Sequence, residues 1–148
     1  MYRRILKHIT NHKILSTEQC GFRLGLRTDN ATYYLTTETL NATNNKLLVG
    51  GIICDLEKTF DSVNHDILLY KLKFYGISEQ ALQIYQSYIG NRYCRTAIYN
   101  GIKNSNKVSN WAKLRHGIPQ GSILGPLLFL LYINDLHKII NKTSAPIN

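Results

Sequence analysis

Asp55 is the side chain in this sequence best placed to do chemistry, because it follows a long apolar run. That run covers residues 47–54 and is continuous rather than alternating, which predicts a strand buried on both faces. Asp55 would then lie where the strand leaves the core, and a carboxylate there indicates a metal-binding acid. The alternative is a residue that caps a helix or shapes a turn.

A second candidate site is the loop at residues 117–121, which reads Gly-Ile-Pro-Gln-Gly. Its glycines let the backbone approach a ligand closely, and Pro119 stiffens the turn. Pro-Gln-Gly alone is a weak signal. The residues that follow, Ser-Ile-Leu-Gly-Pro-Leu-Leu-Phe at 122–129, make the pattern specific.

Three blocks in this order resemble the reverse transcriptases of non-LTR (LINE-like) retrotransposons. They are Gln-Cys-Gly-Phe-Arg-Leu-Gly at 19–25, the spacing of Asp55, Phe60 and Asp61, and residues 117–126. The resemblance runs from about residue 5 to the end of the chain. It departs from the family pattern at Arg27, where serine is usual, and at Thr59, where alanine is usual.

The resemblance implies an α+β fold that is part of a right-hand polymerase. Residues 1–148 would form a single incomplete reverse transcriptase domain, comprising part of the fingers and the first portion of the palm. About residues 1–46 would be fingers-like, and residues 47–148 palm-like with intervening fingers elements.

The resemblance also implies a catalytic centre that uses two Mg²⁺ ions, which in polymerases lie about 3.5–4 Å apart. Asp55 would be the catalytic carboxylate and a metal ligand, and the backbone carbonyl of Leu56 a further ligand. A single aspartate cannot hold both ions. Asp61 is uncertain: it would cap the next helix or bond locally more readily than bind metal.

Five residues would contact the nucleotide or template on the same resemblance. Phe60 resembles the bulky gate that excludes a ribose 2′-hydroxyl and so selects deoxynucleotides. Pro119, Gln120 and Gly121 would line the nucleotide pocket, with Gln120 against the nascent base pair or its sugar. Arg23 would contact the triphosphate or the template, unless it is a solvated surface arginine.

The charge balance favours a polyanionic partner. Eighteen basic and nine acidic residues give a net charge of +9 and a pI near 9.6. Nucleic acid is favoured over a membrane surface, because phosphates attract Lys and Arg and release counterions on binding. A phosphate-tracking surface and a scattered solvated face are both open for the following cations: Lys71, Lys73, Arg92, Arg95, Lys103, Lys107, Lys113 and Arg115.

Composition also narrows the cellular setting. The three cysteines include no CxxC pair, which argues against a zinc ribbon or a disulfide framework and favours a reducing compartment. The longest apolar stretch, residues 123–133, is too short to span a bilayer, so no membrane association is expected. The resemblance places the chain in the nucleus, the cytoplasm or both.

Periodicity predicts the elements that must position these residues. Helices are expected at 2–13, 31–42, 62–74 and 79–89, and from 122 or 126 to 140. The helix at 62–74 would bury Val63, Ile67, Tyr70 and Phe74. Strands are expected at 92–99 and 107–115, with a turn at Asn100-Gly101.

The expected function is a fragment of an RNA-directed DNA polymerase that acts on an RNA template, a DNA primer and deoxynucleoside triphosphates. The family carries its remaining acids in an apolar-x-Asp-Asp motif, and no adjacent aspartates occur in this sequence. The chain is therefore expected to be inactive alone. The alternative is a decayed, non-catalytic remnant that binds nucleic acid.

Overall fold

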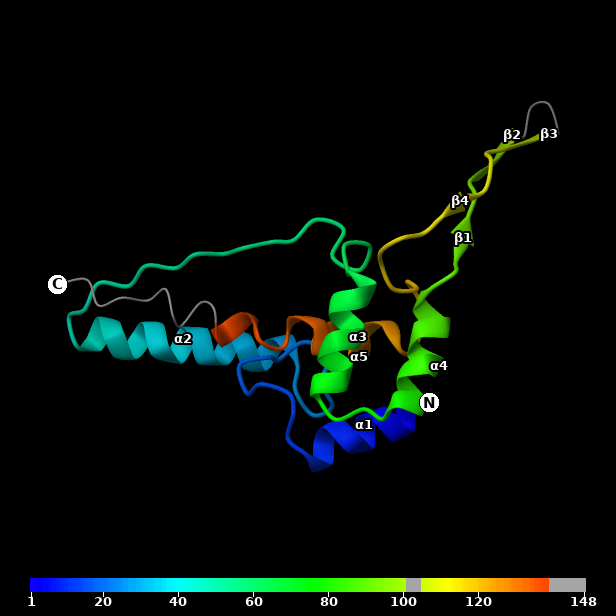
Figure 1. The fold of residues 1–148 in the computed structure, drawn as a ribbon. Helices are drawn as coiled ribbons and strands as arrows, with labels where there is room; N and C mark the ends of the chain where they lie inside the picture. The colour runs from blue at the N-terminus through cyan, green and yellow to red at the C-terminus, as the bar shows by residue number, and fades with distance from the viewer. Residues whose placement is uncertain (101–104, 139–148) are drawn as a thin grey trace. The chain divides into compact units, whose positions relative to one another are not determined.

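A computed structural model describes residues 1–100 and 105–138 of the chain (Figure 1). These residues form five α-helices and four short β-strands, which confirms the mixed α+β class. The chain divides into two compact units. The first comprises Met1–Lys58 and Pro126–Asn148, and the second comprises Thr59–Gly125.

Two helices of the first unit carry its buried apolar residues. α1 (Tyr2–Asn11) buries Ile5 and Ile9. α5 (Gly125–Ile133) begins at the last residue of the second unit and continues through the first. A helix that is apolar on every side must be buried. The residues from Leu127 to Leu131 are accordingly all buried.

The third helix of this unit, α2 (Thr28–Asn44), buries no residue. The predicted helix at 31–42 is confirmed, and it extends from Thr28 to Asn44. Its large apolar side chains Tyr33, Tyr34, Leu35 and Leu40 are all exposed.

The predicted buried strand at 47–55 is wrong. Residues 47–56 have no regular secondary structure, and Leu48, Ile52 and Ile53 are more than nine-tenths exposed. A strand exists only when a neighbour accepts and donates its backbone hydrogen bonds. Among the described residues the four strands pair only with one another, in two two-stranded sheets, so this apolar run has no strand beside it.

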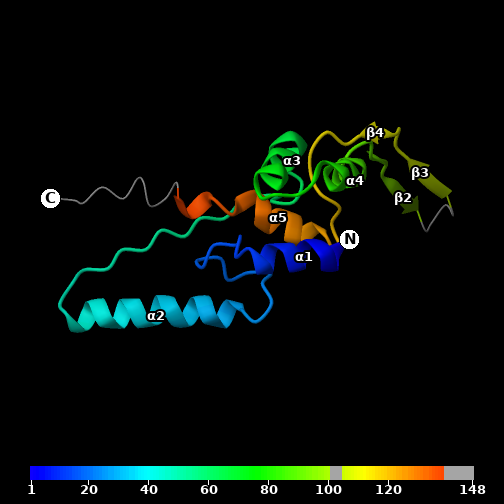
Figure 2. The same ribbon diagram turned by 60° about the horizontal axis from the view of Figure 1, so that its bottom comes forward.

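α3 (His65–Phe74) and α4 (Glu79–Ile89) pack against each other in the second unit (Figure 2). Asn64 caps α3, because its side-chain oxygen accepts hydrogen bonds from the backbone N–H groups of Asp66 and Ile67. Gly76 follows α3 with a φ of +82°, the left-handed conformation that commonly ends a helix.

The predicted buried face of α3 is mostly wrong. Val63 is fully buried as expected, but Ile67, Tyr70 and Phe74 are 46%, 72% and 76% exposed. α3 instead buries Leu68 and Leu72. α4 buries Leu82, Tyr85 and Ile89. Burial raises the pKa of the Tyr85 hydroxyl.

The predicted strand pair of the second unit is present but interrupted. β1 (Tyr93–Cys94) pairs with β4 (Ala112–Lys113), and β2 (Ala97–Asn100) pairs with β3 (Ser105–Val108), both antiparallel. Gly101 of the predicted turn lies outside the described residues.

The predicted helix from 122 or 126 to 140 is present but interrupted. α5 ends at Ile133, Asn134 and Asp135 form a turn, and residues 136–138 are helical again. Residues 139 and 140 lie outside the described part of the chain. No helix within residues 1–100 and 105–138 is long and apolar enough to cross a membrane.

Candidate active site

The predicted metal-binding residues Asp55 and Leu56 lie in the irregular segment of the first unit. Both side chains are exposed, that of Leu56 to 59%. The apolar run therefore does not bring Asp55 to the end of a rigid strand, which was the physical basis for expecting a metal-binding acid there.

Arg23, predicted to contact nucleotide or template, forms hydrogen bonds within its own loop in the first unit. Its Nη1 atom donates to the carbonyl oxygens of Ser16 at 2.5 Å and Gln19 at 3.3 Å. The side chain is half-buried. A guanidinium has five N–H donors, so these two contacts leave others available for a ligand.

In the second unit the structure brings two sequence motifs together. The Gly117 N–H donates to the Val63 carbonyl at 2.8 Å, and the Ile118 N–H donates to the Phe60 carbonyl at 3.0 Å. Asn64 and His116 form an isolated antiparallel bridge between them. Residues 60–64 and 116–118 thus run side by side, which fixes the start of the Pro119-Gln120-Gly121 loop on the segment that carries Phe60.

Two side-chain contacts reinforce this pairing. His65 Nε2 lies 2.7 Å from the Gly117 carbonyl oxygen, within hydrogen-bonding distance. Gln120 Nε2 donates to Asp61 Oδ1 at 3.0 Å, across 59 residues of sequence. The capping role predicted for Asp61 is wrong, because Asn64 caps α3. Asp61 instead contacts the residue expected to face the nascent base pair.

Ser122 shapes the far side of the loop. Its hydroxyl donates to the Pro119 carbonyl at 2.7 Å and accepts from the Gly125 N–H at 3.0 Å. The loop is therefore tied at its start to residues 60–65 and at its end to the beginning of α5. Exposed Gln120 lies between the two anchors.

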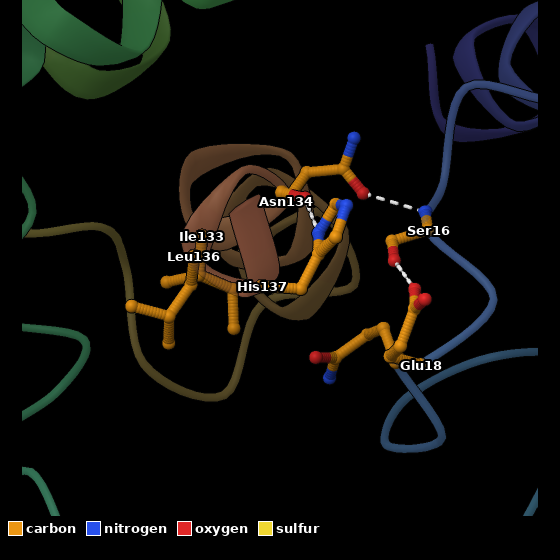
Figure 3. Close-up of a pocket in the computed structure, with 7 residues that line it drawn as sticks. Ser16, Glu18, Ile133, Asn134, Leu136 and His137 are labelled. Atoms are coloured by element: carbon orange, nitrogen blue, oxygen red, sulfur yellow. Dashed lines mark hydrogen bonds between the residues drawn. The ribbon is translucent and has the colours of Figure 1, made fainter. Parts of the chain in front are cut away.

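A cavity of about 170 Å³ in the first unit was not predicted (Figure 3). Asn134, 9% exposed, lies beside it and joins two chain segments. Its side chain accepts from the Ser16 N–H and donates to the Ile14 carbonyl, each at 2.8 Å. The Ser16 hydroxyl donates to Glu18, and this hydrogen bond lowers the pKa of the Glu18 carboxyl. In the sequence, the one signal for Asn134 is that a polar residue follows a long apolar run there.

The residues described do not match a two-ion metal centre. Across residues 1–100 and 105–138, no three His, Cys, Asp or Glu side chains gather where they could hold a metal ion. Mg²⁺ binding needs several oxygen ligands converging from rigid elements. Asp55 on an irregular exposed segment does not meet that requirement.

The chain belongs to the reverse transcriptase (RNA-dependent DNA polymerase) family, which it matches over residues 1–146. The predicted resemblance to the enzymes of non-LTR retrotransposons is confirmed by the relatives that the chain matches.

Three relatives illustrate the match. The probable RNA-directed DNA polymerase from transposon BS of Drosophila melanogaster is 32% identical over 134 residues, covering 86% of this chain and 13% of that protein. The RNA-directed DNA polymerase from mobile element jockey of Drosophila funebris is 31% identical over 143 residues, covering 90% and 15%. The Pol polyprotein from the type-1 retrotransposable element R2 of Popillia japonica is 31% identical over 87 residues, covering 59% and 13%. The chain therefore spans only 13–15% of these relatives.

Proposed function

We propose that this chain contributes the nucleotide-facing part of an RNA-directed DNA polymerase, within a partial right hand of fingers and palm. The observation that carries the proposal is the pairing of residues 60–65 with the Gly117–Gly121 loop. It holds the two most specific family motifs of the second unit in one rigid arrangement. Positioning of the substrate is, with electrostatic stabilisation, one of the two main contributions that a protein makes to phosphoryl transfer.

The proposed roles follow the family motifs. Phe60 excludes a ribose 2′-hydroxyl, and Pro119, Gln120 and Gly121 contact the nascent base pair. The Asp61–Gln120 hydrogen bond supports this assignment, because it restricts the Gln120 amide to one orientation. Arg23 contacts the triphosphate or template through the donors that its own loop does not use.

Asp55 and the Leu56 carbonyl are proposed to contribute to a Mg²⁺ centre that these 148 residues do not complete. The sequence holds no adjacent aspartates, and the described acids form no cluster. The chain alone is therefore proposed not to polymerise DNA. Its substrates are an RNA template, a DNA primer and deoxynucleoside triphosphates, and it acts in the nucleus, the cytoplasm or both, without a membrane partner.

Primer extension on an RNA template with the purified chain tests this proposal. No Mg²⁺-dependent product is expected from the chain alone. Sustained synthesis that Asp55→Asn abolishes would contradict the proposed inactivity. Synthesis that Asp55→Asn leaves unchanged would also remove Asp55 from the catalytic site.

The alternative function is a non-catalytic remnant that binds nucleic acid, and the net charge of +9 favours it. Because binding to phosphates releases counterions from the nucleic acid, such binding must weaken steeply as salt rises.

Nucleotide selection distinguishes the two functions. A polymerase part should bind deoxynucleoside triphosphate beside a primer–template more tightly than ribonucleoside triphosphate, and Phe60→Val should remove the difference. A remnant should show no difference.

A further inference from the structure

We propose that the strand ribbon of the second unit binds single-stranded RNA, with bases stacked on Trp111 and phosphates bound by the surrounding cations. The ribbon is defined as residues 92–100 and 105–115, which include β1, β2, β3 and β4 (Figure 1). The choice of RNA rests on the proposed function. The stacking surface itself rests on the contacts described below.

The charge of the ribbon is of one sign. Residues 91–116 contain no Asp or Glu. Within the described ribbon the cations are Arg92, Arg95, Lys107, Lys113 and Arg115. Such a stretch attracts a polyanion, and no carboxylate on the same ribbon competes for the cations.

The aromatic side chains of the ribbon are largely exposed. Tyr93, Tyr99 and Trp111 are 58%, 65% and 62% exposed. Each described residue of β1, β2, β3 and β4 whose burial is known is exposed. A two-stranded ribbon without a buried face gains no core from aromatic residues. Exposed rings among cations are, however, the usual composition of a surface that binds single strands.

Trp111 lies in a bulge of the ribbon. Between the pairs Cys94–Ala112 and Ala97–Val108, residues 109–111 oppose only residues 95 and 96. The Ser109 N–H donates to the Thr96 carbonyl, and the Thr96 N–H donates to the Ser109 hydroxyl, each at 2.9 Å. Bulges redirect the side chains that they contain. Here the bulge is residues 109–111, which include the tryptophan, and the two hydrogen bonds between Ser109 and Thr96 hold one end of it in place.

Arg95 completes the stacking site. Its guanidinium carbon lies 4.6 Å from the centroid of the Trp111 ring, within the range of a cation–π contact. The contact covers one face of a ring that is still 62% exposed, which leaves surface for a base. The charge of Arg95 is also within reach of the phosphate next to a base stacked there.

Cross-strand pairing extends the same chemistry along the ribbon. Tyr93 lies opposite Lys113, and Ile98 lies opposite Lys107. Opposite residues in an antiparallel pair project to the same face, so an apolar or aromatic side chain and a cation are adjacent at these two pairs. At about 3.3 Å per residue, the seven residues from Tyr93 to Tyr99 extend over about 20 Å, enough for several nucleotides. Duplex bases are already stacked on one another, so the surface should favour a single strand.

Intrinsic fluorescence gives a direct test, because Trp111 is the only tryptophan in the chain. The full chain is titrated with a 12-nucleotide single-stranded RNA, and tryptophan emission is read together with the anisotropy of a label on the RNA. We expect quenching that follows binding, and weaker binding of the duplex of the same sequence. Trp111→Ala should weaken RNA binding about tenfold, and Trp111→Phe should restore most of it.

Tyr33→Ala on α2 is the matched control, since Tyr33 is an equally exposed aromatic, at 69%, outside the ribbon. This variant should bind RNA as the parent does, and far-UV circular dichroism verifies that each variant is folded. RNA binding without quenching, and unchanged in Trp111→Ala, would overturn the stacking site but leave the proposed function standing. Failure of the parent to bind any nucleic acid at low salt would count against both.

Two further probes separate other partners. Tighter binding of single-stranded DNA than of the same RNA sequence would assign the ribbon to a DNA strand and overturn the choice of RNA. Emission that shifts with anionic phospholipid vesicles but not with RNA would identify a membrane surface instead and overturn the proposal.

Discussion

Gly117 determines how closely the two motif segments of the second unit approach each other. Its φ is +87°, a conformation that residues with a Cβ rarely adopt. A Cβ at this position would lie 3.0 Å from the Asp61 Cα and 3.1 Å from the Asp61 carbonyl oxygen. Backbone atoms cannot rotate away as the end of a side chain can, so a larger residue would push residues 60–65 and the loop apart.

Gly117→Ala should therefore lower the free energy of unfolding by more than the roughly 1–2 kcal/mol that a left-handed conformation costs a residue with a Cβ. Gly121→Ala is the control, because Gly121 has a similar φ of +74° but open space around its Cβ position. Gly121→Ala should lower the free energy of unfolding only by what the left-handed conformation itself costs. Urea unfolding of both variants measures the difference, and equal losses would contradict the close approach.

The sequence could predict which residues near Gly117 matter but not how they meet. The motif spacing identified Phe60, Asp61 and Gln120 as parts of one kind of site. It could not identify the Asp61–Gln120 hydrogen bond, which depends on the path of the chain between these two residues. Asp61 and Asn64 are both residue types that cap helices, and Asn64 does so because the first helical turn begins immediately after it.

At the scale of elements, α3 shows why periodicity can identify a helix yet misplace its buried face. Apolar residues occupy Ile67, Leu68, Leu69, Tyr70 and Leu72, so the apolar arc is wide enough to contain two alternative stripes. Packing against α4 selects the stripe of Leu68 and Leu72. Local pattern alone contains no information on where α4 lies.

Leu68→Ala should cost about 2–5 kcal/mol of unfolding free energy, because the side chain is fully buried and its removal leaves a cavity. Tyr70→Ala, at a side chain that is 72% exposed, should stay within about 0.5 kcal/mol. Urea denaturation with a common slope compares the two variants. A larger loss of unfolding free energy for Tyr70→Ala than for Leu68→Ala would support the buried face predicted from the sequence instead.

The segment at residues 47–56 has a local pattern that predicts an element which the structure does not form. Its apolar composition indicates that it is suited to burial, and composition is local information. Whether a strand forms there depends on a neighbouring strand elsewhere in the chain, and the four described strands pair only among themselves. Helices, whose hydrogen bonds are internal, were accordingly predicted well at α1, α2 and α4, whereas this strand was not.

At the scale of the whole molecule, the distribution of charge matters more than its sum. All nine acidic residues lie outside residues 91–116. The net charge of +9 is therefore unevenly distributed. The charged residues within 91–116 are all cations, whereas the nine carboxylates offset many of the cations in the rest of the chain. If polyanion binding followed total charge, the loss of any two cations would weaken it equally. If binding is localised on the ribbon, position decides the effect.

Two double variants separate these possibilities at the same net charge of +7. Lys107→Gln with Lys113→Gln removes two exposed ribbon cations, and Arg3→Gln with Lys7→Gln removes two exposed cations of α1. Single-strand affinity falls with salt at a logarithmic slope of about −0.7 per phosphate contact, so the ribbon variant should lose about 1.4 from the magnitude of that slope. The α1 variant should keep the parent's slope. Equal slopes for the two variants, measured by RNA anisotropy from 50 to about 200 mM salt, would mean that the molecule binds through its overall charge, and the ribbon would lose its special role.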